Sequence, residues 1–258
     1  MKNIALAISI FAAIAVAEPA LADSGEAQDL YHRAIAAAED PNKAAALELF
    51  KQACDAGDSD SCYMAGGMLF GGENGVVADK AAALTYWTKA CDLRDGESCY
   101  QAGISYEGGT GVTADARTAT LLYLKGCKFQ QREACTYAGD MFRDGKGMPQ
   151  VDLEKAASLY RMGCDMEDAD GCFNLGLAYE GGSGIARDLG AAAEKYGLAC
   201  DYLSVTGCLY AGDMYRDGSG VEKDTGKAID YYRKTIRLGA GADESGKAHE
   251  ALKALGAE

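Results

Sequence analysis

The sequence predicts an all-α fold, a solenoid of stacked antiparallel αα hairpins. Two cysteines separated by seven residues occur five times, and successive pairs start 37, 36, 37 and 36 residues apart. A fixed period in this range is typical of solenoids, in which each unit packs on its neighbours. Alanine-rich segments alternate with glycine-rich turns and only three prolines occur, which favours helices. The pairs are Cys54 and Cys62, Cys91 and Cys99, Cys127 and Cys135, Cys164 and Cys172, and Cys200 and Cys208, which are all ten cysteines.

Residues 1–22 have the pattern of a secretory signal peptide. Lys2 precedes an apolar run of fourteen residues, and Ala20-Leu21-Ala22 offers a small-residue cleavage site. The run is shorter than the roughly 18 residues of a membrane-spanning helix, which argues against the alternative of an uncleaved anchor. We therefore expect the mature chain, residues 23–258, to be exported to the periplasm or secreted and not to be embedded in a membrane. Its cysteines are then expected to form disulfides.

The mature chain is strongly acidic. The signal segment carries one Lys and one Glu, so its removal leaves the net charge at −14. Such a chain gains no counterion-release energy from a phosphate backbone, which excludes nucleic acid as the expected partner. The charge instead favours basic proteins or peptides, and we expect a monomer.

The first unit, residues 23–61, is predicted to be an αα hairpin. Apolar residues at helical spacing predict a helix from Ala27 to Ala38. Pro41 ends it, because the residue before a proline is pushed out of the helical region. Asn42 is then predicted to cap a second helix that runs to about Ala56.

The second helix of each unit shows a regular pattern before its cysteine. An N-cap residue stands twelve positions before it, an alanine eight before it and an aromatic residue four before it, so the last two share one helical stripe with the cysteine. The predicted caps are Asn42, Asp79, Asp115, Asp152 and Asp188. The aromatic residues are Phe50, Trp87, Tyr123, Tyr160 and Tyr196.

The first helix of each later unit is predicted to begin at the second cysteine. A glycine follows four positions later in all five units, although glycine costs about 1 kcal/mol within a helix. Close packing of helices is the predicted reason. The glycine-rich turns that follow these helices are predicted to be tight αα turns and not phosphate loops, because they follow helices and bring no phosphate-binding partner residue.

Five repeats and a cap are predicted to complete the stack. The repeats are residues 62–98, 99–134, 135–171, 172–207 and 208–240. Ile236 occupies the place of the next cysteine, and residues 241–258 are predicted to form a capping helix with Ala248, Ala251 and Leu252 on one face.

The repeated residues resemble a known family. The motif Gly-x-x-Tyr-x-x-Gly-x-Gly, an acidic cap and an alanine-rich helix with an aromatic residue resemble the Sel-1-like repeat, a relative of the tetratricopeptide repeat. The recurring Cys-x7-Cys is similar to the secreted bacterial cysteine-rich branch. The resemblance implies a right-handed superhelix whose first helices line a concave, partner-binding face. It implies an adaptor or scaffold function, and for the cysteine-rich branch also penicillin binding with weak β-lactamase-like activity.

The same resemblance bears on the disulfides. In such a stack the end of a second helix lies near the first helix of its own unit and of the next one. Pairing Cys62 with Cys91, and so onward, would leave Cys54 and Cys208 unpaired. Pairing within each Cys-x7-Cys leaves none unpaired and matches the branch, so we expect one disulfide at each joint between units. Each nine-residue loop contributes about 2.6 kcal/mol of stability in the chain-entropy model.

The sequence shows no catalytic constellation. The only histidines, His32 and His249, are expected at opposite ends of the stack, and no serine is followed three residues later by lysine. No metal or cofactor motif occurs, and none is expected to be bound. The acidic pairs Asp58/Asp60 and Asp168/Asp170 are explained by capping and solvation, with general acid–base catalysis as the alternative. We therefore do not expect an enzyme.

The concave face carries the candidate binding residues. The face opposite the core lies two, five and nine positions after the second cysteine of each repeat. Amides there can bond a peptide backbone, and tyrosines offer rigid contact area. A solvated helix face without a ligand is the alternative. The candidates are Gln101, Tyr137, Asp140, Asn174, Tyr210 and Asp213.

The sequence thus predicts an exported scaffold or adaptor that binds a protein or an extended peptide on its concave face. The alternatives are a penicillin-binding protein with β-lactamase-like hydrolase activity and a structural envelope protein. The units also alternate, since Cys135 to Gly147 matches Cys208 to Gly220 at ten of thirteen positions. Duplication of a two-unit block and a surface for an extended ligand are both possible explanations.

Overall fold

A computed structural model describes residues 24–72, 74–239 and 241–257. These residues form thirteen α-helices and no strand. The helices are α1 (Ser24–Ala37), α2 (Ala44–Asp55), α3 (Ser59–Gly71), α4 (Lys80–Asp92), α5 (Gly96–Gly108), α6 (Ala116–Lys128), α7 (Arg132–Asp144), α8 (Leu153–Asp165), α9 (Ala169–Gly181), α10 (Leu189–Asp201), α11 (Val205–Asp217), α12 (Thr225–Arg237) and α13 (Ala242–Ala254). The predicted signal peptide, residues 1–22, lies outside the described residues.

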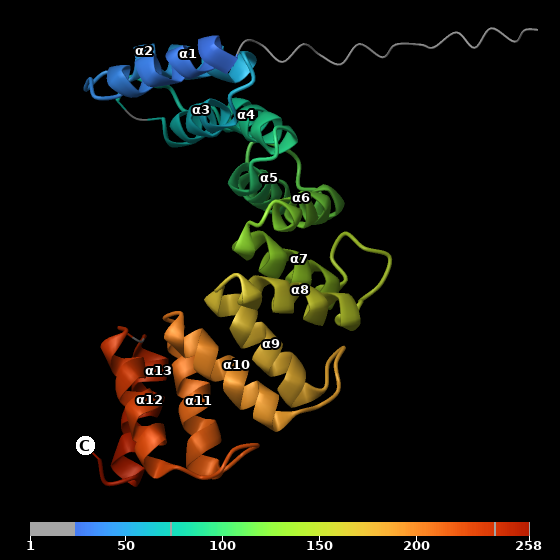
Figure 1. The fold of residues 1–258 in the computed structure, drawn as a ribbon, viewed down its shortest axis with the longest axis vertical. Coiled ribbons are helices and arrows are strands. Elements are labelled where there is room, and N and C mark those ends of the chain that lie inside the picture. Colours follow the sequence, from blue (N-terminus) through green and yellow to red (C-terminus); the bar gives the residue numbers. More distant parts are fainter. Residues whose placement is uncertain (1–23, 73, 240, 258) are drawn as a thin grey trace, which may run out of the picture.

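Consecutive helices pack as hairpins that stack into a curved array (Figure 1). Helices α1 to α12 make six hairpins, and α13 packs on α12 and α11. Ala248, Ala251 and Leu252 of α13 are buried, as predicted for a cap. The predicted α-solenoid of αα hairpins is therefore confirmed. Within the part of the chain that the structure describes, no helix is long and apolar enough to cross a bilayer.

Odd-numbered helices line one side of the array and even-numbered helices the other. Between helices two apart in the chain, the closest packing joins α5 with α7, α7 with α9, α9 with α11 and α11 with α13. In Figure 1 the two ends of the array bend toward the same side of its middle. We call the surface of the odd-numbered helices the inner face and that of the even-numbered helices the outer face.

Most of the predicted helix caps are confirmed. Asp79, Asp152 and Asp188 each accept a hydrogen bond from the backbone N–H three residues on, at 2.9 to 3.0 Å. The prediction for Asn42 was wrong by one residue. Lys43 occupies the N-cap position, and the Asn42 side chain accepts from the N–H of Ala44 at 3.1 Å.

The first helices of the repeats begin three residues earlier than predicted. They start at Ser59, Gly96, Arg132, Ala169 and Val205, before the second cysteine of each pair. The reason is an N-cap inside the Cys-x7-Cys loop: Asp58 accepts from the N–H of Ser61, and Asp95 and Ser204 act in the same way. Each second cysteine therefore lies within a helix.

The five disulfides close within each Cys-x7-Cys, as predicted. The paired Cα atoms lie 4.4 to 4.6 Å apart, and no free cysteine occurs among the described residues. Each disulfide joins the end of an even-numbered helix to the next odd-numbered helix. The outer layer is thereby tied to the inner layer at every joint between hairpins. A chain with this many disulfides is typical of an oxidising compartment.

The recurrent glycine of each first helix lies against an aromatic ring. A Cβ atom added to Gly139 would stand 2.6 Å from the ring of Tyr160, and Gly103, Gly176 and Gly212 meet the corresponding tyrosines in the same way. Close packing is thus the reason for the glycine, as predicted. The neighbour is the buried ring of the same hairpin. The glycine lets that ring pass beneath the inner helix.

Candidate functional site on the inner face

Four buried tyrosines from the even-numbered helices reach acidic residues on the inner face. Each hydroxyl donates a hydrogen bond to a carboxylate on the preceding odd-numbered helix, at 2.5 to 2.8 Å. The pairs are Tyr123 with Glu107, Tyr160 with Asp140, Tyr196 with Glu180, and Tyr232 with Asp213. The acid alternates between two positions along the helix. This explains part of the alternation of units. The carboxylate stands either eight or five positions after the second cysteine, and in both places it accepts from the tyrosine of the same hairpin.

Burial dominates the electrostatics of these pairs. It raises the pKa of Tyr160 well above its usual range, and the negative charge of Asp140 adds to this effect. Burial also raises the pKa of Asp140, although the hydrogen bond from Tyr160 and the charge of Arg143 act in the opposite direction. Asp140 is thus a buried acceptor that is already engaged by Tyr160 and Arg143.

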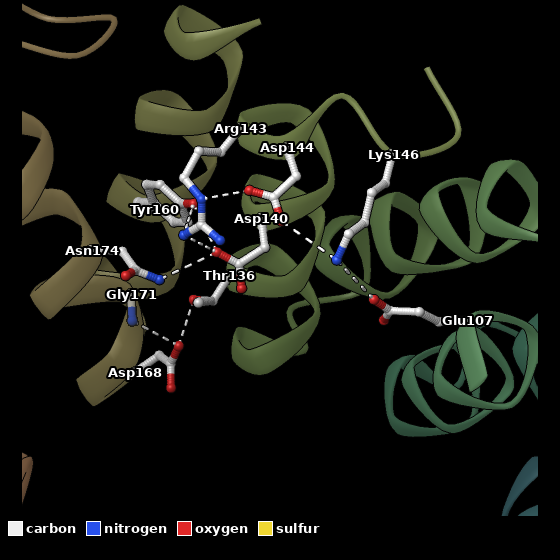
Figure 2. Close-up of polar contacts among 10 residues, drawn as sticks. All are labelled: Glu107, Thr136, Asp140, Arg143, Asp144, Lys146, Tyr160, Asp168, Gly171 and Asn174. Carbon is white, nitrogen blue, oxygen red and sulfur yellow. Dashed lines mark hydrogen bonds and ion pairs between the residues drawn. The ribbon is translucent and has the colours of Figure 1, made fainter. Parts of the chain in front are cut away.

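A polar network surrounds Asp140 (Figure 2). The Arg143 guanidinium lies 2.7 Å from Asp140 and 2.9 Å from Asp144, and it donates to the Tyr160 hydroxyl at 3.1 Å. The Asn174 amide, from the next odd-numbered helix, reaches Asp140 at 3.5 Å. That distance is at the limit of a hydrogen bond, so the Asn174 amide is only weakly engaged.

Lys146 extends this network toward the preceding repeat. Its ammonium lies 3.4 Å from Asp144 and 3.9 Å from Glu107 on α5 (Figure 2). The equivalent repeat, residues 208–240, has Ser219 in the place of Lys146. Residues 99–171 therefore carry the more continuous polar surface.

Two aromatic triads stand on the inner face two repeats apart. Tyr100, Tyr123 and Tyr137 have ring centroids 5.2 to 6.1 Å apart. Their counterparts 73 residues later, Phe173, Tyr196 and Tyr210, have centroids 5.2 to 5.6 Å apart. The outermost rings, of Tyr137 and Tyr210, are each 37% exposed. Each triad therefore presents one supported tyrosine to solvent.

A small hollow of about 120 Å³ lies beside the network, between α8 and α9. Arg143, Tyr160, Asn174 and Leu177 are among the residues that line it. It opens next to the amide of Asn174, so a backbone carbonyl or amide of a bound segment could reach that side chain.

All six predicted binding residues are on the inner face, spread over four helices. Tyr137, Tyr210 and Asn174 offer groups to solvent or to the hollow. Asp140 and Asp213 are engaged by Tyr160 and Tyr232, and Gln101 donates to Glu97 at 2.7 Å. The sequence prediction missed the tyrosine–acid pairs. Their signal was present, since each repeat with a tyrosine carries an acid at one of two places.

One acid of each loop pair is a helix cap, in line with the capping explanation. Asp58 caps α3, and buried Asp168 accepts from the N–H of Gly171 at 3.0 Å and from the Thr136 hydroxyl. His32 lies in α1 and His249 in α13, at opposite ends of the array (Figure 1). In the described ranges, no group of three or more His, Cys, Asp or Glu side chains is arranged to hold a metal ion.

Comparisons with known proteins agree with this architecture. The family model of the Sel1 repeat matches residues 36–58, 59–95, 96–128, 132–168, 169–201 and 205–239. A Sel1 repeat protein from Oxalobacter formigenes is similar at 21% identity and a TM-score of 0.74, covering 82% of this chain and 86% of that one. A search of curated proteins returned no significant match.

Two further solved structures are similar. One is a protective antigen present in uropathogenic Escherichia coli strains that displays an SLR fold, at 24% identity and a TM-score of 0.76. The match covers 90% of this chain and 54% of that protein, so this chain spans about half its length. Cysteine rich protein B from Helicobacter pylori is 30% identical, with a TM-score of 0.42, over 54% of this chain and 98% of its own.

Proposed function

Because the chain belongs to the Sel1 repeat family, we propose that it is a scaffold that binds an extended segment of another protein along its inner face. Sel1 repeat proteins are generally protein-interaction scaffolds. The observation that carries the choice of face is the pair of equivalent aromatic triads, each with one exposed tyrosine. Their spacing of two repeats suits a segment that crosses several hairpins.

The rigidity of the triads supports binding. Tyr137 packs against Tyr100 and Tyr123, and the hydroxyl of Tyr123 is held by Glu107. A side chain that is already ordered loses little entropy when it binds a partner, so more of the contact energy appears as affinity. The Asn174 amide lies on α9 directly after Phe173 of the second triad and would bond the backbone of the segment.

Charge favours a basic segment. The chain carries a net charge of −14, and the charges that act on Asp170 at the start of α9 are those of two other aspartates. Loss of solvent and the charges of Asp168 and Asp140 raise the pKa of Asp170. A lysine or arginine of the partner placed there would relieve this repulsion. We place this binding outside the cytoplasm, on the basis of the signal-like segment 1–22 and the five disulfides.

The proposal is tested with the mature chain as bait in the exported fraction of its own cell. The double variant Tyr137→Ser/Tyr210→Ser is compared with wild type and with Val77→Ser, which changes an apolar side chain that is 84% exposed away from the triads. We expect the double variant to lose about 10-fold or more of its specific partner, about 1.4 kcal/mol, and Val77→Ser to lose none. Equal capture by all three baits would contradict binding at this face.

The two alternatives from the sequence gain no support from the comparisons. A hydrolase is still open to direct test with the chromogenic β-lactam nitrocefin and the purified chain. Turnover that disappears on substitution of one defined residue would count against a purely scaffolding function.

A further inference from the structure

Lysine–aspartate pairs link successive even-numbered helices along the outer face. The aspartate follows the first cysteine of one unit directly. The lysine stands two positions before the first-cysteine position of the next unit. We call each such pair a rung. The rungs are Asp55 with Lys89 at 2.7 Å, Asp92 with Lys125 at 2.6 Å, and Asp201 with Lys234 at 2.9 Å.

The two rungs in the middle of the array are missing. Between α6 and α8, Lys128 stands in the aspartate position and Met162 in the lysine position. Between α8 and α10, Asp165 is retained but Leu198 replaces the lysine. Within the described residues, Lys128 and Asp165 therefore form no ion pair. Lys155, which lies nearby, also forms none there.

An apolar hollow of about 660 Å³ lies between α6 and α8, where a rung is missing. Its floor is formed by Leu124 of α6 and by Leu159, Met162 and Met166 of α8 and its end, with Met162 43% exposed. Lys128, Gln130, Lys155 and Asp165 stand at its rim.

The apolar surface continues beyond the hollow. Leu121, one turn before Leu124 on α6, is 58% exposed. The equivalent position in the other five even-numbered helices is polar. Those residues are Glu48, Thr85, Ser158, Glu194 and Asp230. At this joint the outer face therefore has leucine and methionine both in the rung position, at Met162, and one turn before the hollow, at Leu121.

We propose that this surface, which we call the outer patch, is a second interaction site that takes the apolar face of an acidic amphipathic helix from another protein. Exposed leucine and methionine side chains side by side mark such contacts, and methionine adapts its shape to a partner. A groove between two helices accepts apolar side chains spaced three and four residues apart. Lys128 and Lys155, which form no ion pair with another described residue although the net charge is −14, would pair with carboxylates that flank those side chains.

The intact rungs suggest a variant that tests the outer patch as a binding site. Lys128→Asp/Met162→Lys restores the missing rung in the arrangement of Asp92 and Lys125. It removes the cation at position 128 and places an ion pair over the apolar floor of the hollow. Asp201→Lys/Lys234→Asp reverses an intact rung between α10 and α12 and serves as the matched control, because it leaves both the outer patch and the net charge unchanged. Leu121→Ser is a second, single change on an exposed side chain, for use if the restored rung impairs folding.

The probe is a fluorescent synthetic helix of about 15–20 residues with leucines at helical spacing flanked by glutamates. A peptide with lysines in place of the glutamates is its counterpart, and binding is followed by fluorescence anisotropy with the full mature chain. We expect the acidic peptide to bind wild type and the control about 10-fold more tightly than the lysine peptide, a difference of about 1.4 kcal/mol. The restored rung and Leu121→Ser are each expected to weaken binding of the acidic peptide by a similar factor.

Three results would overturn the proposal. Equal binding of the two peptides, or unchanged binding by the restored rung with the fold intact, would remove the outer patch as an acidic-helix site. Sedimentation that shows a dimer of the wild-type chain, lost in the restored rung, would assign the surface to a second copy. The inner-face variant Tyr137→Ser/Tyr210→Ser should bind the acidic peptide like wild type, which separates this site from the proposed scaffold groove.

Discussion

On the inner face the buried Tyr160 donates to Asp140 at 2.8 Å, whereas on the outer face Lys125 and Asp92 pair at 2.6 Å with 36% and 68% of their side chains exposed. The first contact joins the two helices of one hairpin, and the second joins successive hairpins. A hydrogen bond to a charged group contributes about 1.5–3 kcal/mol when it is protected from water, and an exposed ion pair about 0–1 kcal/mol. The inner face is therefore fixed in geometry, while the outer face tolerates the loss of a rung, as between α6 and α8.

The disulfides connect the two faces, so their reduction should have the largest effect. Five loops of nine residues contribute at most about 13 kcal/mol in the chain-entropy model, comparable with the whole stability of an ordinary domain. We expect the melting temperature, followed by circular dichroism with and without a reductant, to fall by tens of degrees. Thiols that react with an alkylating agent in the untreated native protein would contradict the pairing.

Gly139→Ala should be the most damaging single change to the inner face. The added Cβ atom would stand 2.6 Å from the Tyr160 ring, and displacement of that ring also disturbs its bond to Asp140. We expect the free energy of unfolding to fall by about 2–3 kcal/mol, measured by urea denaturation.

Gly67→Ala is the matched control on another odd-numbered helix. Its added Cβ atom would meet no atom within 4 Å, so the change should stabilise the chain by up to about 1 kcal/mol through helix propensity. Equal effects of the two substitutions would show that helix propensity and not ring packing governs these glycines.

The buried tyrosines should make the protein sensitive to alkaline pH. Burial raises the pKa of Tyr123, Tyr160 and Tyr196 far above the ordinary value of 10.0. The unfolded chain releases these protons from about pH 10 upward while the folded chain keeps them, so the free energy of unfolding falls as the pH rises beyond about 10.

This is measured by comparing tyrosinate absorbance with circular dichroism along a pH titration. The buried tyrosines should ionise together with unfolding, and Tyr160→Phe should reduce the dependence of stability on pH by one proton. Ionisation of these tyrosines in a chain that keeps its helices would contradict the proposed protection.

The smallest effect is expected from an outer rung. Lys125→Met removes the ion pair with Asp92 but leaves both positions in solvent, so the free energy of unfolding should change by less than about 1 kcal/mol. Chemical denaturation at low and high salt measures this, and the difference from wild type should shrink at high salt. A loss as large as that of Gly139→Ala would remove the distinction between the two faces.

Much of the fold could be predicted from local patterns. The Cys-x7-Cys spacing, the caps Asp79, Asp152 and Asp188, and the glycine four positions after each second cysteine are properties of neighbouring residues. Helix starts were predicted three residues too late, because each helix was placed at its second cysteine and Asp58 and Asp168 were explained by capping and solvation without deciding between the two. A cap and a solvated loop residue have the same composition, and only the backbone N–H that each one meets distinguishes them.

The candidate site was predicted less completely. Tyr137, Tyr210 and Asn174 were placed correctly on one face by helical periodicity. Periodicity did not show that Asp140 is engaged by Tyr160, because the two residues meet across two helices, α7 and α8.

The sequence by itself therefore determined the repeat, the helical hairpins and the cysteine pairs, since each depends on residues within about one repeat length. Tertiary structure alone decided which polar groups are engaged and which are available. Tyr160 reaches Asp140 because Gly139 lets its ring pass, and Lys128 lines a hollow with Met162 where the intact rungs have a lysine–aspartate pair. Such contacts depend on how one hairpin is set against another, a geometry that the spacing of residues along a single helix does not contain.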